Sequence, residues 1–225
     1  MKICMSGIVV LMSMVFVAGS AMAETEKPAA VPKGKEIYFG IGTTGATLGY
    51  GHAFGTHTAL RLEANFLSYS RDVSTSSGDY HGSLKLSTLG AYYDAFLLGP
   101  FRVSAGLLAG TNKFDGNAVV TNGQITINNQ QYNAAGEWAK GTVKFKSLSP
   151  YFGIGFGHRP QRGGLGLYGD LGAAYGRPDV SLAVSDGLRA AAGDSNIAAE
   201  QATLQDKADK LKFFPVIRIG LDYQW

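Results

Sequence analysis

The residues from 211 to 225 alternate between two kinds of side chain, and this pattern limits the folds open to the chain. Every second position is apolar: Leu211, Phe213, Pro215, Ile217, Ile219, Leu221, Tyr223 and Trp225. The intervening positions are mixed, and they include Arg218, Asp222 and Gln224. A period of two is the signature of a β-strand, whose successive side chains point to opposite faces. A continuous apolar face behind a face that carries charges predicts a strand between lipid and the inside of a barrel.

The end of this stretch resembles the signal that delivers bacterial outer-membrane proteins to the barrel-assembly machinery. That signal has a polar residue, then a glycine, then two spaced aromatic residues, and Arg218, Gly220, Tyr223 and Trp225 match it. The resemblance implies that the barrel-assembly machinery is a partner. It also implies that the protein is located in the bacterial outer membrane.

The first 23 residues have the features of a secretory signal peptide. Lys2 is followed by a mostly apolar run over residues 8–18, and Ala21 and Ala23 frame an A-x-A cleavage site. We therefore expect a cleaved segment at 1–23, a disordered lead-in at 24–35 and a barrel at 36–225. The only cysteine, Cys4, would leave with the signal peptide, which excludes disulfides and thiol catalysis in the mature chain.

Composition favours a transmembrane barrel over a helical membrane protein or a nucleic-acid-binding protein. Glycine supplies 31 of the 225 residues, about twice the usual ~7%. Charged residues make up 16%, below the typical ~25%, as a large lipid-facing surface would require. No apolar run after Ala23 approaches the length of a spanning helix, and a net charge of +3 is too small to indicate nucleic acid. The sequence has no phosphate loop and no His/Cys cluster, so we expect no cofactor and no metal.

The sequence predicts an all-β fold, an eight-stranded antiparallel up-and-down transmembrane β-barrel with a short helix in the last long outer loop. The expected strands cover 37–43, 46–54, 58–68, 83–98, 101–112, 144–157, 165–175 and 211–225. Short connections at 55–57, 99–100 and 159–164 alternate with long ones at 70–82, 113–142 and 177–210. Transmembrane barrels have short periplasmic turns and long outer loops, so the long connections should face the outside.

Several local features refine this prediction. The helix is expected over 197–210, capped by Asp194 or Ser195. Asn122-Gly123 predicts a small separate hairpin in the second long loop. The segment 43–45 is either a turn or a bulge, and a count of eight strands favours the turn. Pro150 and Pro215 cannot donate to a strand ladder, so bulges are expected at both.

The charged residues that alternate toward the lumen are Arg61, Glu63, Asp94, Arg102, Asp170, Arg218 and Asp222. The interior of an eight-stranded barrel is only wide enough for side chains to fill it. An isolated ion buried there would be very unfavourable. We therefore expect these residues to form a lumen ion-pair network. A narrow pore is the alternative, favoured by lumen-facing Gly40, Gly42, Gly49, Gly51, Gly153, Gly155 and Gly157.

An enzymatic function is considered because His81 and Ser83 are two residues apart at an expected outer rim. This spacing resembles that of eight-stranded outer-membrane enzymes that deacylate lipid A. The surrounding residues do not match that family, and no acidic residue is evident to orient the histidine, so we expect no enzyme. Aromatic residues near strand ends predict interface girdles: Tyr38, Tyr93, Phe101, Tyr175, Tyr223 and Trp225. Trp138 is placed for contacts outside the membrane.

These features together resemble the small eight-stranded outer-membrane proteins of Gram-negative bacteria, the class of the OmpA barrel, OmpX and OmpW. The resemblance implies a structural and surface-interaction role with a filled lumen, exercised through the long outer loops. It implies outer-membrane lipid and lipopolysaccharide as partners, and a host or surface ligand bound by the loops. A narrow channel for small solutes and a lipid-modifying enzyme are the alternatives.

Overall fold

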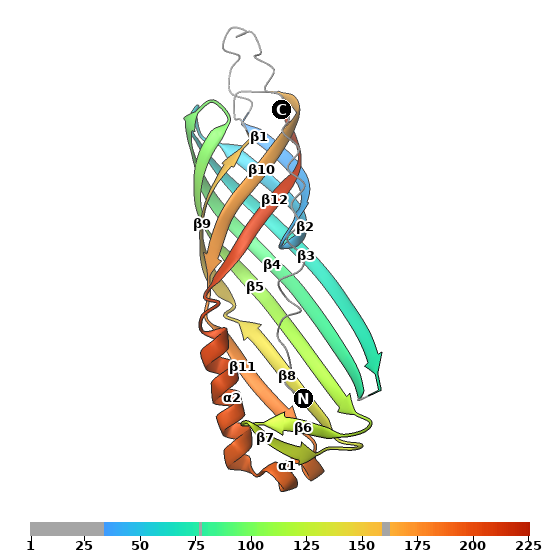
Figure 1. The fold of residues 1–225 in the computed structure, drawn as a ribbon. Coiled ribbons are helices and arrows are strands. Elements are labelled where there is room, and N and C mark those ends of the chain that lie inside the picture. The colour runs from blue at the N-terminus through green and yellow to red at the C-terminus, as the bar shows by residue number, and fades with distance from the viewer. Residues whose placement is uncertain (1–33, 77, 159–162) are drawn as a thin grey trace.

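Eight strands form a ring in this computed structural model, which describes residues 34–76, 78–158 and 163–225 (Figure 1). The ring contains β1 (Lys35–Gly42), β2 (Gly45–Ala53), β3 (Thr58–Thr75), β4 (Gly78–Leu98), β5 (Phe101–Val120), β9 (Leu148–Phe156), β10 (Gly164–Tyr175) and β12 (Phe213–Gln224). All neighbours pair antiparallel, and β9 pairs with both β10 and β5. The predicted all-β, antiparallel ring of eight strands is confirmed.

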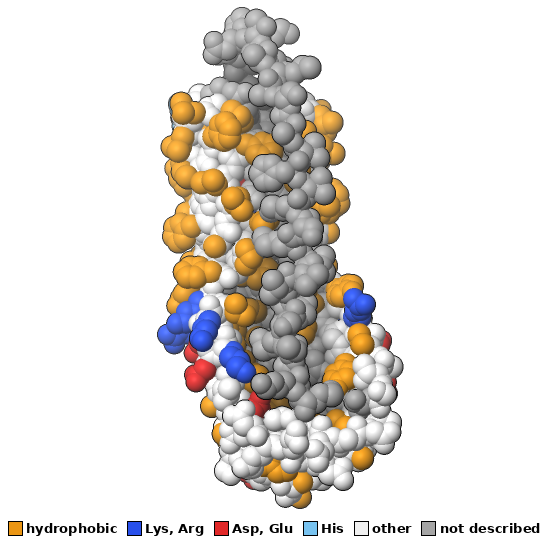
Figure 2. Space-filling model, in the orientation of Figure 1, with side chains coloured by type: hydrophobic (Ala, Val, Ile, Leu, Met, Phe, Trp, Pro, Cys, Tyr) orange, Lys and Arg blue, Asp and Glu red, His pale blue; other side chains and the backbone are white. Residues whose placement is uncertain are grey.

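The ring separates apolar residues outside from polar residues inside, as the alternation in each strand predicts. Figure 2 shows hydrophobic side chains spread over the outer surface of the strands. Phe39, Leu62, Leu167 and Ile219 are among those that are more than half exposed. Their sequence neighbours point inward and are buried or half-buried. This arrangement suits a ring with lipid around it, because apolar surface of this extent would be unfavourable in water.

The segment 43–45 is a turn, so the count of eight strands holds without a bulge. Gly42 and Gly45 face each other across it, and Gly45 has a φ of +96°, which favours glycine. The bulges expected at Pro150 and Pro215 are absent, because each proline pairs in regular register with one neighbouring strand. On the other side, Pro150 lies just before the first residue of β9 that pairs with β10. Pro215 likewise lies before the first residue of β12 that pairs with β1. The missing N–H groups therefore break no ladder.

On one side of the molecule, strands continue well beyond the ring into what we call the outer sheet (Figure 1). The outer ends of β3, β4 and β5 are joined there by β8 (Trp138–Phe145) and β11 (Pro178–Val184), in the order β11-β8-β5-β4-β3. The segment 70–82, predicted as a polar loop, is therefore mostly strand. Its Ser- and Thr-rich composition resembled a loop, but its β3 part pairs with its β4 part, and the β4 part also pairs with β5, which stabilises the segment as strand.

A small hairpin stands at the end of the outer sheet, with its turn in a different place from the one predicted. It consists of β6 (Gln124–Ile127) and β7 (Gln130–Asn133). Its turn residues, Asn128 and Asn129, have φ values of 49° and 61°. Two successive positive φ angles are what a type I′ hairpin turn requires, and asparagine tolerates them. Asn122-Gly123 instead connects β5 to β6.

Two helices, where one was predicted, follow β11. They are α1 (Asp186–Ala192) and α2 (Asp194–Ala208), and Gly193 separates them with a φ of 78°. Gly193, not Asp194 or Ser195, is the N-cap of α2. The break arises because the positive φ at Gly193 ends α1 and lets the chain turn into α2. Neither described helix has the length and apolar character needed to cross a membrane.

Helix α2 lies along the free edge of β11. The backbone N–H groups of Val180 and Leu182 donate to the side-chain oxygens of Gln205 and Gln201, at 2.8 and 3.3 Å. The Gln205 amide nitrogen donates to the carbonyl of Pro178 at 2.8 Å. The helices, the hairpin and the inner face of the outer sheet share one hydrophobic core: Val120, Ile125, Ile127, Ala134, Val184, Leu188, Ala192 and Ile197.

Candidate functional site

Six charged side chains meet inside the ring, and their side chains are cut off from solvent. Arg61, Arg102 and Arg218 supply the positive charges, and Glu63, Asp94 and Asp170 supply the negative ones. They come from β3, β4, β5, β10 and β12, because each occupies an inward position in the alternation of its strand. All six side chains have 0% relative accessibility. The ions are balanced in number, which reduces the cost of burying them.

Asp170 of β10 lies at the centre of this network. Its carboxylate pairs with the Arg102 guanidinium and accepts a hydrogen bond of 3.4 Å from Arg61. It also lies 3.6 Å from Nε of Arg218. Arg61 and Arg102 share a second carboxylate, Asp94, which also accepts a 2.5 Å hydrogen bond from Ser104. One carboxylate therefore connects all three arginines across the interior.

Glu63 forms the second centre, through contacts to charged and neutral donors. Its carboxylate pairs with the guanidinium of Arg218 and accepts hydrogen bonds from Tyr92 at 2.6 Å and Asn65 at 2.9 Å. Tyr38 donates to it more weakly, at 3.3 Å. A carboxylate with donors on several sides is largely compensated for the loss of water.

Buried tyrosines complete the interior, and sequence reasoning missed them. The Arg218 guanidinium carbon lies 5.0 Å from the ring centroid of Tyr92 and 5.7 Å from that of Tyr151. Arg61 lies 5.2 Å from the Tyr92 ring and 5.7 Å from that of Tyr38. These are cation–π distances, and the attraction is stronger away from water. The signal was available, because Tyr38, Tyr92, Tyr151 and Tyr168 all have the same inward parity as the charges.

The lumen-facing glycines do not open space for a pore, because neighbouring side chains occupy it. A Cβ at Gly49 would overlap the ring of Tyr38, and one at Gly153 would overlap the hydroxyl of Tyr151. At Gly155 the obstacles are Asp170 and Arg102. These glycines leave room for large inward-pointing side chains of the same strand or of adjacent strands. The observation that favoured a narrow pore is thereby removed.

Asp222 lies apart from the other predicted network members, toward the inner end of the ring. It is buried and accepts a 2.8 Å hydrogen bond from the Gln224 amide. Gln224 also contacts Glu36, whose carboxylate lies 2.9 Å from Nδ1 of fully buried His158. A cavity of about 10 Å³ borders Glu36, His158 and Gln224. That volume is room for about one water molecule.

The residues of the C-terminal pattern have different environments. Arg218 points into the network, and Gly220 sits opposite Gly40 in β1. The rings of Tyr223 and Trp225 stack at 6.1 Å on the outer surface. The predicted cleavage residues Ala21 and Ala23 lie outside the described residues. Tyr38 was assigned to an interface girdle in error: it is 2% exposed inside the ring. The other five girdle aromatics are exposed: Tyr93, Phe101, Tyr175, Tyr223 and Trp225.

The outer sheet has a polar hollow on the face that continues the outside of the ring. Its volume is about 560 Å³, and its lining includes His81, Lys85, Asp115, Asn117, Trp138 and Lys140. Asp115 accepts a 2.6 Å hydrogen bond from Thr142 and pairs with Lys113 at 2.7 Å. Partial burial alone would raise the pKa of Asp115, but these two partners hold it below its usual value. Asp115 is therefore a fixed negative charge among lysines.

His81 and Ser83 lie on this same hollow, and an acidic residue stands beside the histidine. Asp72 of β3 pairs with Nδ1 of His81, an acidic partner that was not evident from the sequence. The side chains of Asp72 and His81 are both well exposed. Within residues 34–76, 78–158 and 163–225, no hydrogen bond joins His81 to Ser83. That hydrogen bond is the contact through which a base activates a serine nucleophile. No metal-binding group of three or more His, Cys, Asp or Glu occurs in the described part of the chain.

Comparison with known proteins gives structural neighbours but no sequence family. No family model matches the chain, and no curated protein matches it. The crystal structure of Acinetobacter baumannii CarO2 superposes with a TM-score of 0.61 at 24% identity, covering 87% of this chain and 100% of that one. Acinetobacter baumannii CarO gives 0.60 at 24% identity, covering 88% and 100%. This chain has the same fold as those two proteins.

A third structure is more distant. A major outer membrane protein from Thermus thermophilus covers 85% of this chain and 98% of its own, with 14% identity and a TM-score of 0.42. That score is too low to establish a shared fold. The first two neighbours, at 24% identity, confirm the predicted resemblance to β-barrel proteins at the level of the fold.

Proposed function

We propose that this protein is an outer-membrane β-barrel with a closed interior, which acts through its outer sheet, hairpin and helices. The observation that carries the proposal is the network around Asp170, in which three arginines and three carboxylates fill the interior. A solute path would have to separate these pairs. An open state would have to give up these ion pairs together with the hydrogen bonds that the carboxylates accept from Tyr92, Asn65 and Ser104, so we expect it to be rarely populated.

The location of the remaining polar groups supports the same function. Outside the ring interior, polar side chains with room for a partner gather on the outer sheet, where strands, hairpin and helices pack around a core of their own. Such an ordered projection differs from mobile loops, because it can present a fixed surface. Binding residues are commonly carried on connections that a rigid scaffold positions.

Conductance across a planar bilayer tests the proposal. Purified protein refolded into detergent and inserted into the bilayer should give no steady current above that of the lipid alone. Uptake of a small sugar into liposomes should also match that of protein-free liposomes. A reproducible open conductance in the wild-type protein, or solute uptake that rises with the amount of protein, would contradict the closed interior and favour a narrow channel.

A further inference from the structure

Lysines form a row across three neighbouring strands of the outer sheet. Lys85 of β4 stands directly opposite Lys113 of β5, which stands directly opposite Lys144 of β8. Like charges directly opposite on a sheet destabilise it. Asp115 pairs with Lys113, and Asp179 faces Lys144 in the register. Lys85 and Lys144 make no ion pair with any described residue, so the row keeps uncompensated positive charge.

The row lies just beyond the apolar surface of the ring and on the same face. Leu89, Ala109 and Leu148 are also opposite one another on β4, β5 and β9, and each is four residues from its lysine. Four residues of strand span about 13 Å. Lys85, Lys113 and Lys144 therefore stand about one headgroup layer outward from side chains that would contact acyl chains.

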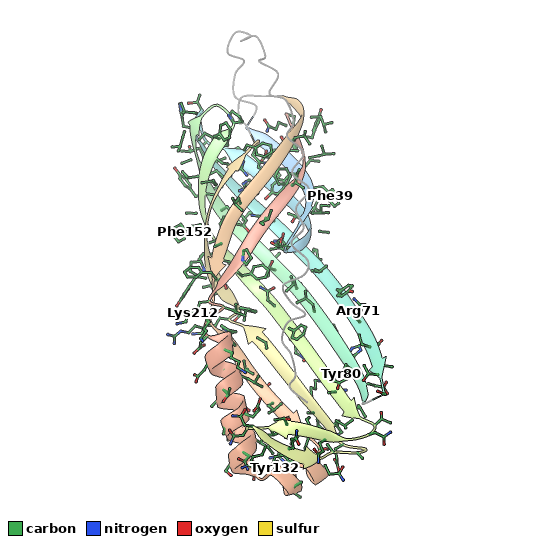
Figure 3. All side chains as sticks on the ribbon, viewed as in Figure 1. Phe39, Arg71, Tyr80, Tyr132, Phe152 and Lys212 are labelled. Carbon is green, nitrogen blue, oxygen red and sulfur yellow. The ribbon has the colours of Figure 1, made fainter. Side chains whose placement is uncertain are left out.

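Other basic residues extend this row around the molecule at the same level. The Lys146 N–H donates to the carbonyl of Arg177 at 3.3 Å, and the Gly176 N–H donates to the carbonyl of Lys212 at 2.9 Å. Figure 2 shows Lys and Arg side chains gathered at the outer limit of the apolar surface, and Figure 3 labels Lys212 there. We call the set Lys85, Lys113, Lys144, Lys146, Arg177 and Lys212 the basic belt.

The hollow described above continues from the belt toward the outer end. Lys85 belongs to both, and Trp138 and Asn117 lie farther out on the same face. The Trp138 side chain is 40% exposed although it is a large apolar residue. An indole face packs against the C–H groups of a sugar ring, and the carboxylate, amide and ammonium groups nearby can bond its hydroxyls. Lysine ammonium groups bind phosphate as point charges.

We propose that the basic belt and the hollow bind the phosphorylated saccharide headgroup of a glycolipid in the surrounding outer leaflet. The phosphates pair with Lys85, Lys113 and Lys144, and a sugar packs on Trp138. Three features select a membrane glycolipid over a soluble partner: the belt borders the lipid-facing surface, its row of three lysines carries more positive charge than its carboxylate partner balances, and the hollow opens beside it. This inference rests on the proposed outer-membrane location.

The test measures lipid that stays bound to the purified protein in native mass spectrometry. The probes are rough-type lipopolysaccharide with phosphates and core sugars, the same material after enzymatic dephosphorylation, lipid A alone, and phosphatidylglycerol. The main variant is K85Q/K113Q/K144Q. Its matched control is K35Q/R189Q/K207Q, which removes the same charge from basic residues that lie off the belt. Each variant is first checked for a folded barrel by its heat-dependent mobility on gels.

We expect the belt variant to bind phosphorylated lipopolysaccharide about tenfold to a hundredfold more weakly than wild type, with the control unchanged. Dephosphorylation should weaken wild-type binding to a similar extent. Trp138→Ala should weaken binding of lipopolysaccharide but leave lipid A binding unchanged, because lipid A lacks the core sugars.

Two results would overturn the inference: a folded belt variant that binds as wild type does, or phosphatidylglycerol binding as tight as that of lipopolysaccharide. The second result would show only general attraction to negative lipid. These failures are distinct from failure of the proposed function, because the location is tested separately by finding folded protein in outer-membrane fractions of cells.

Discussion

Arg218 of β12 and Glu63 of β3 form an ion pair across the interior of the ring, although 155 residues separate them in the sequence. The two strands are not neighbours, since β1 and β2 lie between them in the sheet. The pair therefore joins two strands that are not adjacent in the ring, through side chains in the interior. Backbone hydrogen bonds link each strand only to the next, so contacts of this kind determine how the far sides of the ring are held.

Replacing Arg218 with alanine should destabilise the protein much more than replacing its neighbour Ile219. Arg218→Ala leaves Glu63 buried without its cation, at a cost of about 3–5 kcal/mol for a fully desolvated site. Ile219→Ala removes an exposed side chain from the outer surface and serves as the control. Urea unfolding of protein refolded into detergent gives both values. Equal midpoints for the two variants would show that the pair contributes nothing to stability.

A methyl group at Gly49 should disrupt packing that the same group at Gly141 leaves untouched. The added Cβ at Gly49 would overlap the ring of Tyr38, whereas Gly141 has open space around it. Overpacking of this kind typically costs about 1–3 kcal/mol. Gly49→Ala should therefore lower the thermal midpoint. Gly141→Ala should change the free energy of unfolding by no more than about 0.5 kcal/mol and leave the midpoint close to that of wild type. Similar midpoints would contradict the role of Gly49 in leaving room for Tyr38.

Single cysteines should report which end of the molecule faces outward. Ser76, Asn129 and Ala191 lie at the end of the outer sheet or in the structures packed on it, and Gly99 lies in a turn at the opposite end. All four positions are exposed. A membrane-impermeant maleimide should label the first three on intact cells. It should reach a cysteine at 99 only after the outer membrane is permeabilised. The reverse pattern would invert the topology.

Loss of the Gln205 side chain should loosen the contact between α2 and β11. Its amide accepts from Val180 and donates to Pro178, and each such bond contributes about 1 kcal/mol. Gln205→Ala should speed hydrogen exchange at the amide of Val180. The control is Thr203→Ala, which removes only an exposed bond to the helix's own backbone. Exchange at Val180 that is unchanged by Gln205→Ala would show that α2 is held by other contacts.

The ring was predictable because outward apolar residues and inward polar or small residues alternate along its strands. The inward parity of Arg61, Asp94 and Asp170 follows from alternation alone, and an eight-stranded interior leaves little choice but contact among them. Which partner each residue takes was not predictable. Asp170 meets three arginines because the stagger between strands brings β10 level with β3, β5 and β12. Single-sequence reasoning cannot fix that stagger.

The outer sheet was harder to predict because its stability comes from distant partners. The segment 70–82 has few apolar residues, so periodicity favoured a loop, yet it pairs residue by residue with its neighbours. The Asn128-Asn129 turn was missed because Asn122-Gly123 is the stronger short-range turn signal. The pairing of Asp72 with His81 depends on the same long hairpin. Contacts between residues on paired strands cannot be predicted when those strands are predicted to be loops.

The amides of Gln201 and Gln205 have a consequence for neighbouring molecules. Strand β11 would otherwise expose unpaired N–H and C=O groups, a template onto which a strand from another copy could add. Outer-membrane proteins are confined to a plane at high density, where such addition would spread sideways from molecule to molecule. By occupying those groups, α2 removes the edge of β11 as a site for strand addition. A chain without α2 should form lateral clusters while its ring remains folded.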